Sequence, residues 1–155
     1  MKKTFFDCGT RDATASLGLL ALRVMVGLMM LVGHGIPKLQ NYAARKDFFY
    51  VPDFLPRSWA PACLIACIVA EVLAAALVIV GLATRPAAFI LGFCMVVAAF
   101  GALGATPWFQ TSPTLIETKE LSIMYLIPMV AIILAGAGAY SLDANLCKDR
   151  KRRRW

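Results

Sequence analysis

Charged residues are scarce in this sequence. Of its 155 residues, 16% are charged and 60% are apolar, and the mean hydropathy is +0.71. Soluble domains carry about 25% charged residues, so this composition argues against an ordinary soluble domain. Four membrane spans of roughly 20 residues each would use most of the length. We therefore expect no separate soluble catalytic domain within these residues.

Patterns that bind metals and prosthetic groups are also lacking. The chain has five cysteines and a single histidine, His34, and no two cysteines stand in Cys-x-x-Cys spacing. Structural zinc and iron–sulfur sites are commonly built from such pairs. The sequence therefore predicts no metal site, and it shows no heme or flavin motif. Cys63 and Cys67 are four residues apart, which is awkward for a disulfide within one helix, so we do not expect a redox pair there.

Long apolar runs are what the sequence has in abundance, and each is long enough to cross a bilayer as a helix. We expect the first run to end at Pro37. The turn between the second and third runs is very short, which predicts an antiparallel hairpin. The predicted fold is all-α, a four-helix transmembrane bundle over 17–143, with an N-terminal segment 1–16 and a basic tail 144–155. The four predicted spans are about 17–35, 59–83, 86–104 and 119–138.

The net charge of +7 reflects a concentration of Lys and Arg near the ends of the chain. Beside a membrane span, a basic tail favours anionic lipid headgroups or simply marks topology, and we set nucleic-acid binding aside. With four spans, the side that holds both termini carries ten Lys and Arg and the other side five, so the positive-inside rule places both termini in the cytoplasm. The ten are Lys2, Lys3, Arg11, Arg85, Lys148, Arg150, Lys151, Arg152, Arg153 and Arg154, and the five are Lys38, Arg45, Lys46, Arg57 and Lys119.

A few ionisable residues fall inside or beside the predicted spans, where each needs a partner or a water-filled cavity. Arg23 and His34 share one face of the first helix. Glu71 lies near the middle of the second span, and we expect its partner to be Arg23 or His34. Lys38 would extend the polar face only if the helix continued past Pro37, which we do not expect.

These polar residues have two interpretations that the sequence leaves open. A buried pair can simply fix helix register, or it can serve a bound substrate. His34 can exchange a proton near neutral pH, or it can hydrogen-bond a loop carbonyl. Glu120 is the acidic residue of the fourth helix that we expect to turn inward, whereas Glu117 suits the helix dipole whatever the function. Pro128 should kink that helix.

Five short motifs, taken in order, resemble the DoxX family over about residues 17–143. They are Leu22-Arg23, Gly33-His34-Gly35-Ile36-Pro37-Lys38, Glu71, Gly81-Leu82-Ala83-Thr84-Arg85 and Ala139-Tyr140-Ser141-Leu142-Asp143. The resemblance implies a small four-helix protein of the bacterial cytoplasmic membrane. Its recurrent polar positions would here be Arg23, His34, Lys38, Glu71, Glu120, Tyr140 and Asp143, of which we expect Tyr140 and Asp143 to be structural.

The same resemblance implies a function linked to quinones. Some members resemble the membrane subunits of thiosulfate:quinone oxidoreductase, and others accompany membrane oxidoreductase complexes. The expected role is a subunit or accessory protein of a redox system that binds a quinone or similar apolar carrier and contacts a redox partner protein. The alternative is a non-enzymatic scaffold or small-solute carrier with a structural buried ion pair. Small residues on the helix faces also permit an oligomer.

Overall fold

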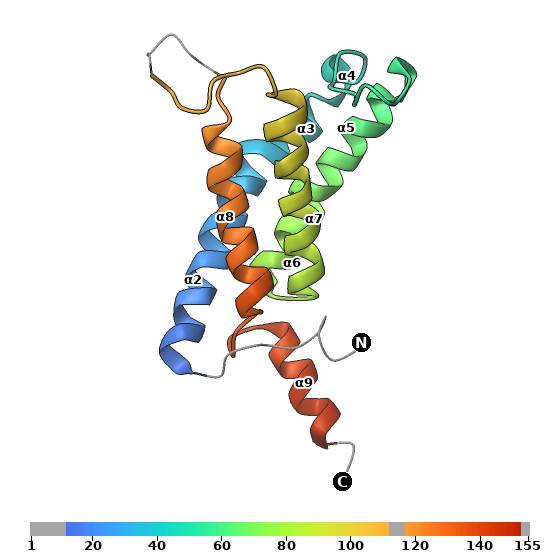
Figure 1. Ribbon diagram of the computed structural model, residues 1–155. Helices are drawn as coiled ribbons and strands as arrows, with labels where there is room; N and C mark the ends of the chain where they lie inside the picture. Colours follow the sequence, from blue (N-terminus) through green and yellow to red (C-terminus); the bar gives the residue numbers. More distant parts are fainter. Residues whose placement is uncertain (1–11, 112–116, 153–155) are drawn as a thin grey trace.

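The computed structural model describes residues 12–111 and 117–152, which form a bundle of helices without any strand. Four helical rods run side by side, and a further helix extends from one end of the bundle (Figure 1). The predicted all-α, four-helix transmembrane bundle is confirmed. Hereafter the loop end is the end of the bundle at helix α4 (Tyr42–Arg45), and the tail end is the end at helix α9 (Leu142–Arg152).

The first rod is longer than the sequence predicts. It consists of α2 (Ala13–Met30), the π-helical turn η1 (Leu31–Gly35) and α3 (Ile36–Gln40), which follow one another without a break. The expectation that the helix ends at Pro37 is wrong. In the π-helical turn the Ile36 N–H donates to the Leu31 carbonyl, five residues back, so the hydrogen-bond pattern has already shifted where the proline enters. The missing N–H of Pro37 then falls in a first turn, where it is tolerated.

The second rod contains a π-helical turn as well. It runs through the short 3-10 helix η2 (Arg57–Trp59), α5 (Ala60–Ile68), the π-helical turn η3 (Val69–Ala74) and α6 (Ala75–Val80). It ends at Gly81, whose φ of 72° is in the left-handed region that favours glycine. The rod therefore stops about one turn earlier than the predicted boundary at residue 83.

The third rod follows after a tight turn, as the sequence predicts. It consists of α7 (Thr84–Val97) and the π-helical turn η4 (Ala98–Ala102). The fourth rod, α8 (Glu120–Ala135), begins where expected but is shorter than predicted. It ends because Gly136 and Gly138 adopt positive φ values, 84° and 77°, which break the helical path before α9.

The rods have the lengths and surfaces of membrane helices. The first three, at 28, 24 and 19 residues, are long and apolar enough to cross a bilayer, while α8 has 16 residues, or about 24 Å of helix. Many large apolar side chains are exposed on the outside of the bundle, among them Phe89, Phe93, Ile127 and Leu134. Such a surface suits contact with lipid rather than with water.

The core lies where the four rods meet. The most extensive packing between rods is between α7 and α8 and between α2 and α6. Small residues allow these approaches: a Cβ at Gly27 would overlap the side chain of Ile79 on α6. The buried apolar residues that form the centre are Met30, Ala74, Ala75, Val78, Ala87, Ala88, Leu91, Met95, Tyr125, Met129 and Ile132.

Candidate functional site

A cavity opens among the rods at the loop end of the bundle. Its volume is about 630 Å³, within the range of roughly 300–1,000 Å³ that is typical of small-molecule sites. It combines apolar side chains with several ionisable ones. The lining includes Met30, His34, Lys38, Glu71, Met95, Glu117, Glu120, Leu121, Met124 and Tyr125. The three methionines and the ionisable residues line the same space, so the site is amphipathic.

A buried ion pair forms one wall of this cavity. The Lys38 ammonium lies 2.5 and 2.6 Å from the two carboxylate oxygens of Glu71. Glu71 is only 3% exposed and Lys38 18% exposed. A charge in such a place needs a partner, and Lys38 supplies it because α3 continues past Pro37. The sequence-based expectation that Glu71 pairs with Arg23 or His34 is wrong.

The depth of Glu71 explains why Arg23 is not its partner. A Cβ built at Gly35 would lie 2.8 Å from the Glu71 carbonyl oxygen, so these two residues stand at the same level. Arg23 is twelve residues earlier on the same rod, which is about 18 Å of helix. Arg23 therefore belongs to the other end of the bundle, where it meets a different set of partners.

Two π-helical turns present the cavity residues. His34 belongs to η1 and Glu71 to η3, and these two turns pack against each other. A π-helical turn inserts an extra residue and is often found at functional sites. Because Gly35 has no side chain, η1 can lie directly on the backbone of η3. This contact keeps His34 and Glu71 on the same cavity.

His34 and Glu120 both line the cavity. The His34 ring meets the Tyr125 ring edge to face, with centroids 5.4 Å apart and planes at 86°. Glu120 begins α8, and its carboxylate accepts a hydrogen bond of 3.1 Å from the backbone N–H of Gln110. Glu117, which we interpreted as a dipole effect alone, also lines the cavity.

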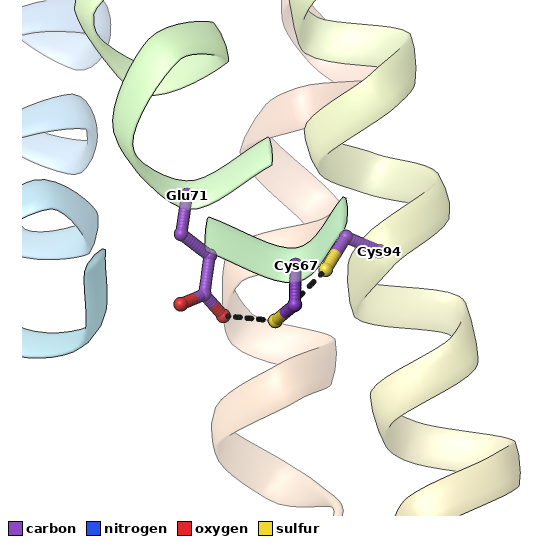
Figure 2. A group of neighbouring side chains, drawn as sticks. All are labelled: Cys67, Glu71 and Cys94. Atoms are coloured by element: carbon purple, nitrogen blue, oxygen red, sulfur yellow. Dashed lines mark hydrogen bonds between the residues drawn. The ribbon is translucent and has the colours of Figure 1, made fainter. Parts of the chain in front are cut away.

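Two cysteines that the sequence analysis did not connect lie beside Glu71. The Cys67 thiol donates to Oε1 of Glu71 at 3.4 Å, and the Cys94 thiol donates to Cys67 with the sulfurs 3.8 Å apart (Figure 2). Cys67 comes from α5 and Cys94 from α7, so the contact is between helices. One sequence signal exists: Cys67 lies 14 residues before Gly81 and Cys94 lies 11 residues after Ala83. In an antiparallel hairpin, similar distances from the turn mean similar depth.

A second polar cluster lies at the tail end, where its hydrogen bonds connect the ends of several helices. Arg23 is fully buried and donates a 2.7 Å hydrogen bond to the backbone carbonyl of Tyr140. Asp143 accepts hydrogen bonds from the N–H groups of Ala83 and Thr84, both at 2.9 Å, and from the Thr84 hydroxyl at 2.8 Å. The Asp143 carboxylate thus caps the first turn of α7. Tyr140 contributes its backbone, and its side chain is exposed.

A family comparison covers the part of the chain that holds the Lys38–Glu71 wall of the cavity. The DoxX family model matches residues 18–104, more than half of the chain. The chain belongs to the DoxX family. Within this DoxX match lie His34, Lys38, Glu71 and both cysteines of the cluster, whereas Glu120 lies beyond it. The chain matches no curated protein and no solved structure.

Proposed function

We propose that this DoxX protein is a subunit or accessory protein of a membrane redox system and binds a quinone or similar apolar carrier in the loop-end cavity. The cavity itself is the observation that carries the proposal. It has the volume of a small-molecule site, it lies in a bundle with a lipid-facing surface, and it combines methionines with ionisable groups. A quinone needs both kinds of contact, because its ring carbonyls are polar and its tail is apolar.

The polar wall offers what a quinone head requires. The ammonium of Lys38 and the ring of His34 can donate hydrogen bonds to ring carbonyls. The Lys38–Glu71 pair keeps this wall neutral overall, which suits an uncharged ligand in the membrane. His34 has a side chain that can exchange a proton near neutral pH, as reduction of a quinone requires. Met30, Met95 and Met124 supply adaptable apolar contacts.

Quinone content of the purified protein tests this proposal. The protein is purified from its own membranes in mild detergent, extracted with organic solvent and analysed for quinone by mass spectrometry. We expect about one quinone per chain, and at least a fivefold lower content in His34→Ala and Lys38→Met variants. Arg57→Gln, which changes an exposed residue away from the cavity, should keep the wild-type content. A wild-type protein without quinone, or equal loss in the Arg57 variant, would overturn the proposal.

The proposal extends to partners and location. Electrons would pass directly between the carrier and a reductant or through a redox partner protein. We place the protein in the bacterial cytoplasmic membrane with both termini in the cytoplasm, on the charge asymmetry of ten against five Lys and Arg. The helix α9 continues from the tail end, and its basic sequence suits anionic headgroups on that side.

A scaffold or small-solute carrier is the second candidate, and the Lys38–Glu71 ion pair is the observation that favours it. A purely structural pair can be replaced by apolar residues, whereas removal of one partner leaves the other charge buried and unpaired. The double variant Lys38→Met/Glu71→Met should therefore recover most of the thermal stability lost in Lys38→Met. If the double variant also binds quinone like wild type, the pair is structural and the scaffold role is favoured. Recovered stability with lost quinone supports the redox role.

A further inference from the structure

The group formed by Cys67, Glu71 and Cys94 has the arrangement of a metal site. One ligand atom from each residue lies within 4.8 Å of the other two, and Figure 2 shows both thiols and the carboxylate turned toward one another. The two cysteines come from different helices, so the group depends on the folded bundle.

The distances agree with a tetrahedral ion of zinc size. With Zn–S bonds of about 2.3 Å and tetrahedral angles, two sulfurs would stand about 3.8 Å apart, and a sulfur and a carboxylate oxygen about 3.5 Å. The observed Cys67–Cys94 sulfur distance is 3.8 Å, and the distance from Cys67 Sγ to Glu71 Oε1 is 3.4 Å. The third distance, between the Glu71 oxygen and the Cys94 sulfur, is within 4.8 Å.

The charges of the group also suit a divalent cation. In the metal-free form Lys38 and Glu71 neutralise each other, and both cysteines carry protons that point along the Cys94, Cys67, Glu71 chain of hydrogen bonds. Binding of Zn²⁺ to two thiols releases two protons, so the net charge of the group stays at zero. A monovalent ion bound to two thiolates would leave one uncompensated negative charge in the membrane interior, which is costly.

We propose that Cys67, Cys94 and Glu71 bind a divalent thiophilic cation of the zinc class. The two thiolates are soft ligands that select zinc-like ions over magnesium or calcium. Glu71 can contact the ion and Lys38 together, because a carboxylate has about four lone-pair positions. Lys38 then orients a ligand of the metal, as outer-shell partners commonly do. Three protein ligands leave one position open, which is typical of zinc sites that bind water or substrate.

The cavity provides a route by which such an ion can arrive. Glu71 belongs both to the ligand group and to the cavity wall. Glu117 and Glu120 line the same cavity toward the loop end, and their carboxylates attract cations. This inference does not depend on quinone binding, because Cys67 and Cys94 are not among the residues that line the cavity.

Metal titration of the full-length protein in detergent tests the proposal. Reduced, metal-free protein is titrated with Zn²⁺ by equilibrium dialysis and with Co²⁺ as a spectroscopic probe of thiolate coordination. We expect one tight site per chain, with a thiolate-to-cobalt charge-transfer band. Cys67→Ser and Cys94→Ser should each weaken Zn²⁺ binding at least tenfold and remove that band. Cys63→Ser is the matched control, one turn away on the same helix, and should bind like wild type.

Protection of the native thiols in membranes that contain the wild-type protein gives a second measurement, which needs no variant. Zn²⁺ should slow maleimide labelling of Cys67 and Cys94 at least fivefold, read residue by residue by mass spectrometry, and leave Cys63 labelling unchanged. Three results would overturn the proposal: no tight Zn²⁺ site, equal loss of binding in the Cys63 variant, or a Cys67–Cys94 disulfide in place of bound metal. Loss of quinone with retained zinc would contradict only the redox function.

Discussion

Lys38 balances the buried charge of Glu71 although it lies beyond a proline. Its ammonium reaches both oxygens of Glu71 because the rod passes through Pro37 as a helix to Gln40. Without Lys38, the carboxylate would be a nearly buried, unpaired charge, a state that costs several kcal/mol in typical proteins. Lys38 thus compensates the buried charge of Glu71 and also gives the site a hydrogen-bond donor.

Asp143 is the residue of greatest structural consequence at the tail end. We predict that Asp143→Ala lowers the free energy of unfolding by about 2–4 kcal/mol, because the N–H groups of Ala83 and Thr84 lose their acceptor in a largely buried place. Thermal unfolding in detergent measures this loss. The control Asp53→Ala removes an exposed carboxylate and should change stability by less than about 0.5 kcal/mol. Equal melting temperatures for both variants would contradict the capping role.

At the level of elements, the π-helical turns set the geometry of the cavity. Both η1 and η3 lie where the first two rods meet, and each carries one of the central polar residues, His34 or Glu71. The extra residue in such a turn rotates the helix that follows, so α3 directs Lys38 toward the second rod. Hydrophobic periodicity alone assumes 3.6 residues per turn and cannot anticipate this rotation.

Two neighbouring glycines allow a matched test of how η1 packs on η3. We predict that Gly35→Ala destabilises the protein by about 1–3 kcal/mol, because its Cβ would lie 2.8 Å from the Glu71 carbonyl oxygen and the backbone must move. Gly33→Ala should be neutral or stabilising by up to about 1 kcal/mol, since nothing lies within 4 Å of its Cβ. Thermal unfolding compares the two. We also expect Gly35→Ala to lower the quinone content. An unchanged melting temperature in Gly35→Ala would contradict the close packing of η1 on η3.

The sequence predicted the helices better than the side-chain contacts between them. Apolar runs and the short connection between the second and third of them sufficed for the four rods, because the length of an apolar run is a local property of the sequence. The pairing of Lys38 with Glu71 depended on whether a helix survives Pro37, which the preceding π-helical turn decides. Distances from the tight turn place Cys67 and Cys94 at similar depth, but their contact also requires that the two side chains face each other, which depends on how the rods pack.

For the whole molecule, two polar clusters join the rods at opposite ends of an apolar core. In the tail-end cluster, Arg23 links α2 to the segment before α9, and Asp143 links α9 to the start of α7. The loop-end cluster links the first and second rods through Lys38 and Glu71. Between them the core is apolar and closely packed. This division supports a structural role for the tail end and a ligand role for the loop end.

Orientation in the membrane can be tested on the whole molecule with cysteine labelling. We predict that a membrane-impermeant maleimide added to intact cells modifies a Ser58→Cys variant and leaves the native Cys147 unmodified. Ser58 is exposed at the loop end, and Cys147 lies on α9 at the tail end. Permeabilised cells supply the control, in which both positions should react. Labelling of Cys147 in intact cells would reverse the proposed orientation.

The number of Lys and Arg residues in the basic tail should decide that orientation. Replacement of its six Lys and Arg by Gln lowers the count on the side of the termini from ten to four, against five on the other side. Since Lys and Arg near span ends bias orientation and C-terminal charges can reverse it, we predict that the variant inserts in both orientations. The maleimide assay should then label Ser58→Cys only in part in intact cells. A variant with the six residues shuffled among tail positions keeps the count and should behave like wild type; unchanged labelling in the Gln variant would show that the tail does not set topology.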